Sequence, residues 1–199
     1  MNIDFLVYLV HVLFWSSFGL TRVIVRRSAR FASIGRDESA VAKLQTAPYS
    51  RALVAVHMLA FGVMYFGMGI TVFSNRVPDL FTGQRIAATL IIALGAWLAC
   101  WALLYFGSWR FRAKLDAGHQ LATGGPFKFV RHPIYMGLNL LAFGTAVWIP
   151  TATLWAAFLL MLAGSDLRAR AEEKLLTHVF GAAYSEYCKH ISRFLPGIY

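Results

Sequence analysis

Four apolar stretches, each long enough to cross a lipid bilayer, restrict the fold of this sequence more than any other feature. A membrane-spanning helix needs about 20 consecutive, mostly apolar residues. The stretches run over residues 5–25, 52–73, 86–107 and 134–164. The last is too long for one span and has Pro150 near its middle, so we expect a tight helical hairpin that turns at Ile149–Thr151. The sequence therefore predicts an all-α integral membrane protein of about five transmembrane helices, followed from Ser165 by a polar C-terminal helix.

The composition agrees with this prediction. Hydrophobic residues make up 58% of the 199 residues and charged residues 14%. A soluble domain could not cover so much apolar surface with so few charges, whereas lipid solvates apolar side chains directly. We expect a single membrane domain, with a three-helix half at residues 1–107 and a more polar half at residues 108–199. The first stretch lacks a basic start and a small-residue cleavage site, so we interpret it as a retained helix.

The positive charges are distributed unevenly along the chain. The formal net charge is +10, but the basic residues flank apolar stretches and form no soluble patch, which argues against nucleic-acid binding. If the N-terminus lies outside, the inside segments Arg22–Arg51, Arg110–Arg131 and Arg168–Arg193 hold 17 of the 19 lysines and arginines. The positive-inside rule favours this orientation. We therefore expect the inner, cytoplasmic membrane, with both later polar segments and the C-terminus on the cytoplasmic side.

The two cysteines carry no recognisable chemistry. Cys100 lies inside an apolar stretch and Cys188 in the polar C-terminal segment. Their positions fit neither a disulfide framework nor a metal-ligand spacing. We expect no metal site.

The first polar segment with chemical potential reads HQLATGGPFKFVRHPIY, from His119 to Tyr135. Its Gly-Gly-Pro sequence predicts a sharp turn whose backbone can approach a ligand. Pro133 suits the first turn of a helix, where free N–H groups can receive an anion. The alternative is interfacial anchoring, because arginine, histidine and tyrosine commonly lie at the level of lipid headgroups.

The second polar segment, RARAEE, directly follows the last apolar stretch. Arg168 and Glu172 are four residues apart and share one face of a helix, and Arg170 and Glu173 share a neighbouring face. The alternative here is a solvated helix with ion pairs. Its position at the membrane boundary, on the same side as the first segment, favours a functional role. Tyr184 and the segment around it are interpreted as structural.

Three signatures occur in order: HQLATGGPF leading into RHPIY, then RARAEE, then FGAAYSEY before RFLP. Together they resemble the isoprenylcysteine carboxyl methyltransferase family and its bacterial and archaeal relatives, over residues 119–199. The resemblance implies S-adenosyl-L-methionine as methyl donor and makes residues 108–199 the catalytic, donor-binding half. It implies that Arg168 is the catalytic residue that holds the substrate carboxylate. The implied donor contacts are His119, Gln120, Leu121, Ala122, Phe127, His132, Pro133, Ile134, Tyr135 and Glu172.

The expected function is transfer of a methyl group to a lipophilic or lipid-modified acceptor in the membrane. The favoured acceptor is a carboxylate of prenylcysteine type. An α-carboxyl group has a pKa of about 3.5, so it is ionised at neutral pH and needs no general base. Three alternatives remain open: a phospholipid amine or small thiol as acceptor, a non-enzymatic protein that binds lipid headgroups, and a reductase related to the sterol reductases. Members of that last class usually have more spans than this chain.

Overall fold

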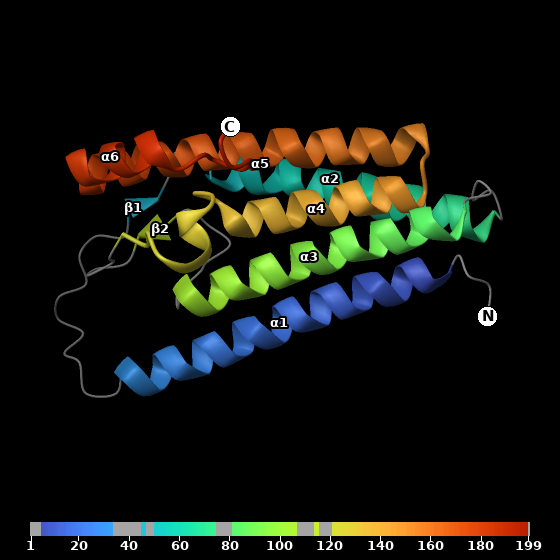
Figure 1. The fold of residues 1–199 in the computed structure, drawn as a ribbon, viewed down its shortest axis with the longest axis horizontal. Coiled ribbons are helices and arrows are strands. Elements are labelled where there is room, and N and C mark those ends of the chain that lie inside the picture. The colour runs from blue at the N-terminus through green and yellow to red at the C-terminus, as the bar shows by residue number, and fades with distance from the viewer. Residues whose placement is uncertain are drawn as a thin grey trace.

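The computed structural model describes residues 5–33, 45–46, 50–74, 81–106, 114–115 and 121–198. Its elements are α1 (Leu6–Ser33), β1 (Gln45–Thr46), α2 (Ser50–Phe73), α3 (Thr82–Phe106), β2 (Lys114–Leu115), the 3₁₀ helix η3 (Gly125–Lys128), α4 (Pro133–Trp148), α5 (Ala152–Phe180) and α6 (Ala182–His190). The long helices lie side by side along one axis, and the strand pair β1–β2, η3 and α6 gather at one end of the bundle (Figure 1). The predicted all-α fold is confirmed for the described part of the chain.

Within the described residues, four helices are long and apolar enough to cross a membrane: Leu6–Ser28, Ala52–Phe73, Thr82–Phe106 and Ala152–Phe180. The fifth apolar helix, α4, has only 16 residues, of which 12 are buried. Its length is about 24 Å, less than the roughly 30 Å of a hydrocarbon core. Because the other helices enclose α4, it need not meet lipid along its length. A helix of this length can begin below one surface of the hydrocarbon core or end below the other.

The helical hairpin forms where the sequence predicts it. Helix α4 ends at Trp148 and α5 begins at Ala152. The Thr151 side chain accepts a hydrogen bond from the Leu154 backbone N–H at 3.4 Å, as an N-cap residue does. Pro150 stands between the helices, in a turn where its missing N–H costs nothing.

The C-terminal region differs from the prediction of a separate polar helix that starts at Ser165. Helix α5 passes through Ser165 without a break and continues to Phe180. With 29 residues it is about 43 Å long, so its last turns extend beyond a hydrocarbon core of about 30 Å. The chain then turns at Gly181, whose φ of 54° favours glycine, and forms the short helix α6. The change from apolar to polar sequence marks a change of surroundings, not the end of a helix.

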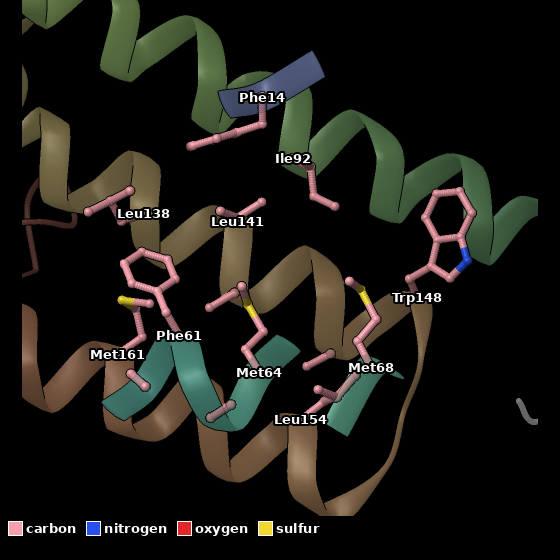
Figure 2. Close-up of a cluster of buried hydrophobic side chains, with 14 of the residues drawn as sticks. Phe14, Phe61, Met64, Met68, Ile92, Leu138, Leu141, Trp148, Leu154 and Met161 are labelled. Atoms are coloured by element: carbon pink, nitrogen blue, oxygen red, sulfur yellow. The ribbon is translucent and has the colours of Figure 1, made fainter. Parts of the chain in front are cut away.

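The apolar core joins all five apolar helices. Figure 2 shows Met64 and Met68 of α2 on the side that faces Leu141 of α4, with Leu154 and Met161 of α5 nearby. Large apolar side chains also cover the outer surface of the bundle. Among those at least half exposed are Leu13, Leu20, Leu59, Phe66, Leu90, Leu94 and Trp97. An apolar exterior around an apolar interior fits a protein whose solvent is lipid.

A buried polar network holds α1 against the rest of the bundle. The His11 ring of α1 lies 3.0 Å from Tyr65 Oη of α2 through Nδ1, and 2.9 Å from Thr145 Oγ1 of α4 through Nε2. Trp15 of α1 also donates to Tyr65 Oη. Hydrogen bonds between helices of this kind contribute to association in a membrane, where burial of apolar surface alone does not drive it.

Candidate active site

Two segments that are far apart in the sequence meet at the end of the bundle where α6 lies (Figure 1). After α6 the chain turns back and runs parallel to the residues before α4. The backbone N–H of Arg131 donates to Ser192 O at 2.9 Å, and that of His132 donates to Arg193 O at 3.2 Å. Tyr187 of α6 donates from its hydroxyl to the Phe127 carbonyl at 2.6 Å. These bonds fix the loop before α4 onto the C-terminal segment.

The Glu173 carboxylate is the centre of the ion pairs at this end. Arg193 donates to its two oxygens, from Nε at 3.0 Å and from Nη2 at 2.7 Å. Arg131 adds a contact from Nε at 3.0 Å, and His132 Nε2 lies 3.2 Å away. Arg193 also donates to Asp166 at 2.7 Å. Both oxygens of Glu173 are thus occupied by protein groups from three separate segments of the chain.

The neighbouring Glu172 has different surroundings. Its Oε1 accepts a short hydrogen bond from the Tyr135 hydroxyl, and its Oε2 lies 3.6 Å from His132 Nδ1. The Glu172 side chain is 21% exposed, against 14% for Glu173. Glu172 is therefore the more exposed of the two carboxylates and lies next to two aromatic rings.

Arg168 completes the cluster. It is only 3% exposed, and its guanidinium carbon lies 4.9 Å from the centre of the Tyr135 ring. A cation over an aromatic face is stabilised by the ring quadrupole, more so when water is excluded. The rings of Tyr135 and His132 are stacked, with centroids 5.7 Å apart. The structure thus brings together the two polar segments, with a buried cation and an accessible carboxylate within one group of side chains.

The remaining candidate residues form the support of this cluster. Pro133 is the first residue of α4, as predicted, and Ile134 packs in a small apolar cluster with Phe127. The Phe127 ring lies between Tyr105 and Phe106, with centroids 6.1 and 5.8 Å away. Leu121 and Ala122 are half-buried in the loop before η3. His119 and Gln120 lie outside the described residues.

The loop turns sharply at the predicted glycines. Gly125 has a φ of 56°, a conformation that favours glycine. A Cβ atom there would also lie 2.6 Å from Tyr105 Cδ2. Tyr187, interpreted from the sequence as structural, holds this loop by its bond to Phe127. Burial raises the pKa of the Tyr187 phenol, so the hydroxyl stays a neutral donor.

A family model described as phospholipid methyltransferase matches residues 84–183, half of this chain. The chain belongs to this family. The protein-S-isoprenylcysteine O-methyltransferase of Schizosaccharomyces pombe is 29% identical over 127 residues, which cover 62% of this chain and 54% of the relative. The Saccharomyces cerevisiae protein of the same name is 34% identical over 89 residues, covering 44% and 37%. The chain thus matches about half, or less, of the length of these relatives.

A solved structure supports the same assignment. The eukaryotic intramembrane Ras methyltransferase ICMT, an isoprenylcysteine carboxyl methyltransferase, superimposes with a TM-score of 0.61 at 22% identity. The match covers 94% of this chain and 63% of that protein. At this identity the likeness shows a shared fold, and with the four apolar helices it identifies this family member as an integral membrane protein.

Some residues of this phospholipid methyltransferase family member were missed by sequence reasoning. Asp166 accepts from Arg193, the arginine of the RFLP signature, which was interpreted as structural and which holds Glu173. His57 on α2 lies against Tyr135 with ring centroids 5.9 Å apart. His57 and Arg193 both lie outside the matched residues 84–183. A polar side chain within an apolar stretch is the signal that could have found His57.

Proposed function

We propose that this protein is a membrane methyltransferase that uses S-adenosyl-L-methionine and acts on a lipophilic carboxylate of prenylcysteine type. The observation that carries the proposal is the meeting of Arg168 and Glu172 with His132 and Tyr135 at one end of the bundle. The relatives named above are isoprenylcysteine methyltransferases, which supports the same chemistry.

The residues present fit the proposed donor. S-adenosyl-L-methionine would supply a methyl group already activated by a positively charged sulfur. Glu172 offers carboxylate oxygens to ribose hydroxyls or an amino group, and the stacked rings of His132 and Tyr135 offer aromatic surface. Glu173 does not fit this role, because Arg131 and Arg193 occupy its oxygens. This favours Glu172 as the acidic contact.

The other donor contacts stay predictions from the resemblance. Leu121 and Ala122 would contribute from the loop, and Pro133 and Ile134 from the start of α4, largely through their backbone because both are buried. Phe127 is 8% exposed and would act as packing surface beneath the donor. His119 and Gln120 would complete the set.

Arg168 would hold the acceptor carboxylate. Its guanidinium can form a two-pronged contact with a carboxylate, which fixes orientation as well as position. An ionised carboxylate needs no proton removed, so the protein's task is to position the acceptor and exclude water. The burial of Arg168 restricts the position of its guanidinium and keeps water away from it.

The depth of the site favours an acceptor held in the membrane. Helix α4 is about 24 Å long, so if its Trp148 end lies at one boundary of a hydrocarbon core of about 30 Å, Pro133 lies roughly 6 Å inside the other boundary. A polar headgroup attached to an apolar chain can reach this level from the side, between helices. We propose that this end of the bundle faces the cytoplasm and the N-terminus lies outside, because the sequence segments expected on the inside hold 17 of the 19 lysines and arginines.

A phospholipid amine is the second candidate acceptor, and the description of the matching family favours it. An ammonium group would have to lose a proton before transfer, and Tyr135 or His132 would then take part in proton transfer. Arg168 argues against this candidate, because a buried guanidinium repels an ammonium group and attracts a carboxylate.

Two measurements test the proposal. Calorimetry in detergent should show that the purified protein binds S-adenosylhomocysteine, and absence of binding at millimolar ligand would remove the enzyme proposal in favour of a lipid-binding protein. Mass spectrometry of membrane extracts incubated with isotopically labelled donor should show labelled methyl esters. Labelled phospholipid amines instead would replace the carboxylate by the second candidate.

A further inference from the structure

Three polar side chains from three helices meet in the apolar interior, one helical turn from the candidate site. His57 of α2, Asn139 of α4 and Ser165 of α5 are each at most 4% exposed. His57 Nε2 lies 3.3 Å from Ser165 Oγ, and the Ser165 hydroxyl donates to Asn139 Oδ1 at 2.8 Å. Polar groups that lack a partner inside a membrane cost several kcal/mol. These bonds therefore fix α2, α4 and α5 relative to one another.

The hydrogen bonds of Ser165 limit where the protons of His57 can lie. If the single hydroxyl proton of Ser165 goes to Asn139, His57 donates to Ser165 from Nε2, and Nδ1 faces the Leu53 carbonyl. The heavy atoms also allow the opposite direction. With the amide turned, Asn139 donates to Ser165, Ser165 donates to His57, and Nδ1 donates to the Leu53 carbonyl 3.5 Å away. This second arrangement satisfies both ring nitrogens with a single proton, and a neutral ring can lie close to the permanent charge of Arg168 without repulsion.

The network lies one turn from the two residues that form the cation–aromatic pair of the site. Asn139 follows Tyr135 by four residues on α4, and Ser165 precedes Arg168 by three on α5, so each pair shares a helix face. The His57 ring itself contacts the Tyr135 ring, with centroids 5.9 Å apart. His57 thus bonds to the helix of Arg168 and packs on the ring that Arg168 covers.

The packing of α2 on α5 at this level is close. A Cβ atom on Gly164 would lie 3.1 Å from His57 Nδ1 and 3.2 Å from Val56 Cγ1. Such distances are tighter than ordinary van der Waals contacts, so a larger residue would displace the imidazole. The sequence keeps the smallest residue where the His57 ring must approach α5.

We propose that His57 is a positioning residue of the acceptor site. Its bond to Ser165 holds the imidazole against Tyr135, and Tyr135 in turn supports the guanidinium of Arg168 in the orientation that receives a carboxylate. This inference rests on the proposed function for the identity of the acceptor. Tyr135 donates to Glu172 and is itself one of the proposed donor contacts, so a change at His57 should also affect donor affinity. The effect should be smaller than on acceptor binding, because the donor would keep its contacts with Glu172 and His132.

The test separates the hydrogen bond from the ring. His57→Phe keeps a ring and loses the bond, whereas the amide of His57→Gln can reach the position of Nε2 and keep it. His11→Phe is the matched control, because His11 is also buried and bonded to Tyr65 and Thr145 in a separate network. The measurements are KM and kcat with N-acetylated S-farnesylcysteine, and the affinity for S-adenosylhomocysteine, in detergent.

We expect His57→Phe to raise the acceptor KM by about tenfold or more and to weaken donor-product affinity by a smaller factor, about threefold or less. His57→Gln should recover most of the lost acceptor affinity. His11→Phe should lower thermal stability and leave the acceptor KM unchanged. An equal change of KM in His57→Phe and His11→Phe, or no recovery in His57→Gln, would overturn the proposal.

A readout without turnover keeps this inference separate from the proposed function. In protein labelled with fluorotyrosine, the fluorine resonance of Tyr135 can be assigned by its loss in Tyr135→Phe. It should shift in His57→Phe and return towards its original position in His57→Gln. If the protein binds no donor product and methylates nothing, the proposed function fails, but the Tyr135 resonance still tests whether His57 positions Tyr135. An unchanged Tyr135 resonance in His57→Phe refutes the positioning role.

Discussion

Replacing Arg193 by methionine tests how much the C-terminal segment contributes to the site. Arg193 is 13% exposed and donates to both Glu173 and Asp166. Removing one partner of a buried ion pair costs about 3–5 kcal/mol. Because Glu173 keeps Arg131 and Asp166 keeps Arg170, we expect the lower end, about 3 kcal/mol. For a chain of this size that corresponds to a fall in melting temperature of about 6–12 °C.

The assay is thermal unfolding in detergent, followed with a thiol-reactive dye that reports exposure of the half-buried Cys100 and Cys188. Arg170→Met is the matched control. Arg170 donates to the same Asp166, but its side chain is 55% exposed, and exposed ion pairs contribute about 0–1 kcal/mol. Arg193→Met should also weaken binding of S-adenosylhomocysteine, because the backbone of this segment holds His132. Equal melting shifts in the two variants would refute the reasoning.

Three further substitutions address the site itself. Arg168→Ala should abolish methyl transfer and leave the affinity for S-adenosylhomocysteine nearly intact by calorimetry; loss of that affinity would mean that Arg168 binds the donor. Glu172→Gln should weaken binding of S-adenosylhomocysteine by about tenfold, the effect of losing one charged hydrogen bond. A larger loss of affinity in Glu173→Gln, with an unchanged melting temperature, would make Glu173 the acidic donor contact instead. Tyr187→Phe removes the bond to the Phe127 carbonyl and should lower the free energy of unfolding by about 1 kcal/mol, measured by thermal unfolding. An unchanged melting temperature would show that this bond does not stabilise the protein.

The sequence was most informative where a local rule decides the backbone. Pro150 within a long apolar stretch located the hairpin, and Pro133 located the first turn of α4. Helix spacing also placed Arg168 and Glu172 on one face, and the structure has both beside Tyr135. These features depend on residues that are close in the chain.

Features that depend on which helices are neighbours could not be read in this way. The partners of Glu173 come from residues 131, 132 and 193, and spacing within RARAEE gives no information about them. The sequence shows His57 as a polar residue within an apolar stretch, but it does not show that Ser165 of α5 is its partner. The boundary at Ser165 was misplaced because a change from lipid to water alters side chains but leaves the helical backbone free to continue.

The pairing of residues 131–132 with residues 192–193 has a consequence for biogenesis. During synthesis the bundle can insert and pack as its helices emerge, but the loop before α4 has no partner strand until the segment beyond α6 has left the ribosome. The proposed donor-binding side of the protein should therefore mature after translation of this segment, whereas the apolar helices can pack earlier. Ribosome-stalled chains that end before Ser192 should accordingly be inserted in the membrane but should not bind S-adenosylhomocysteine.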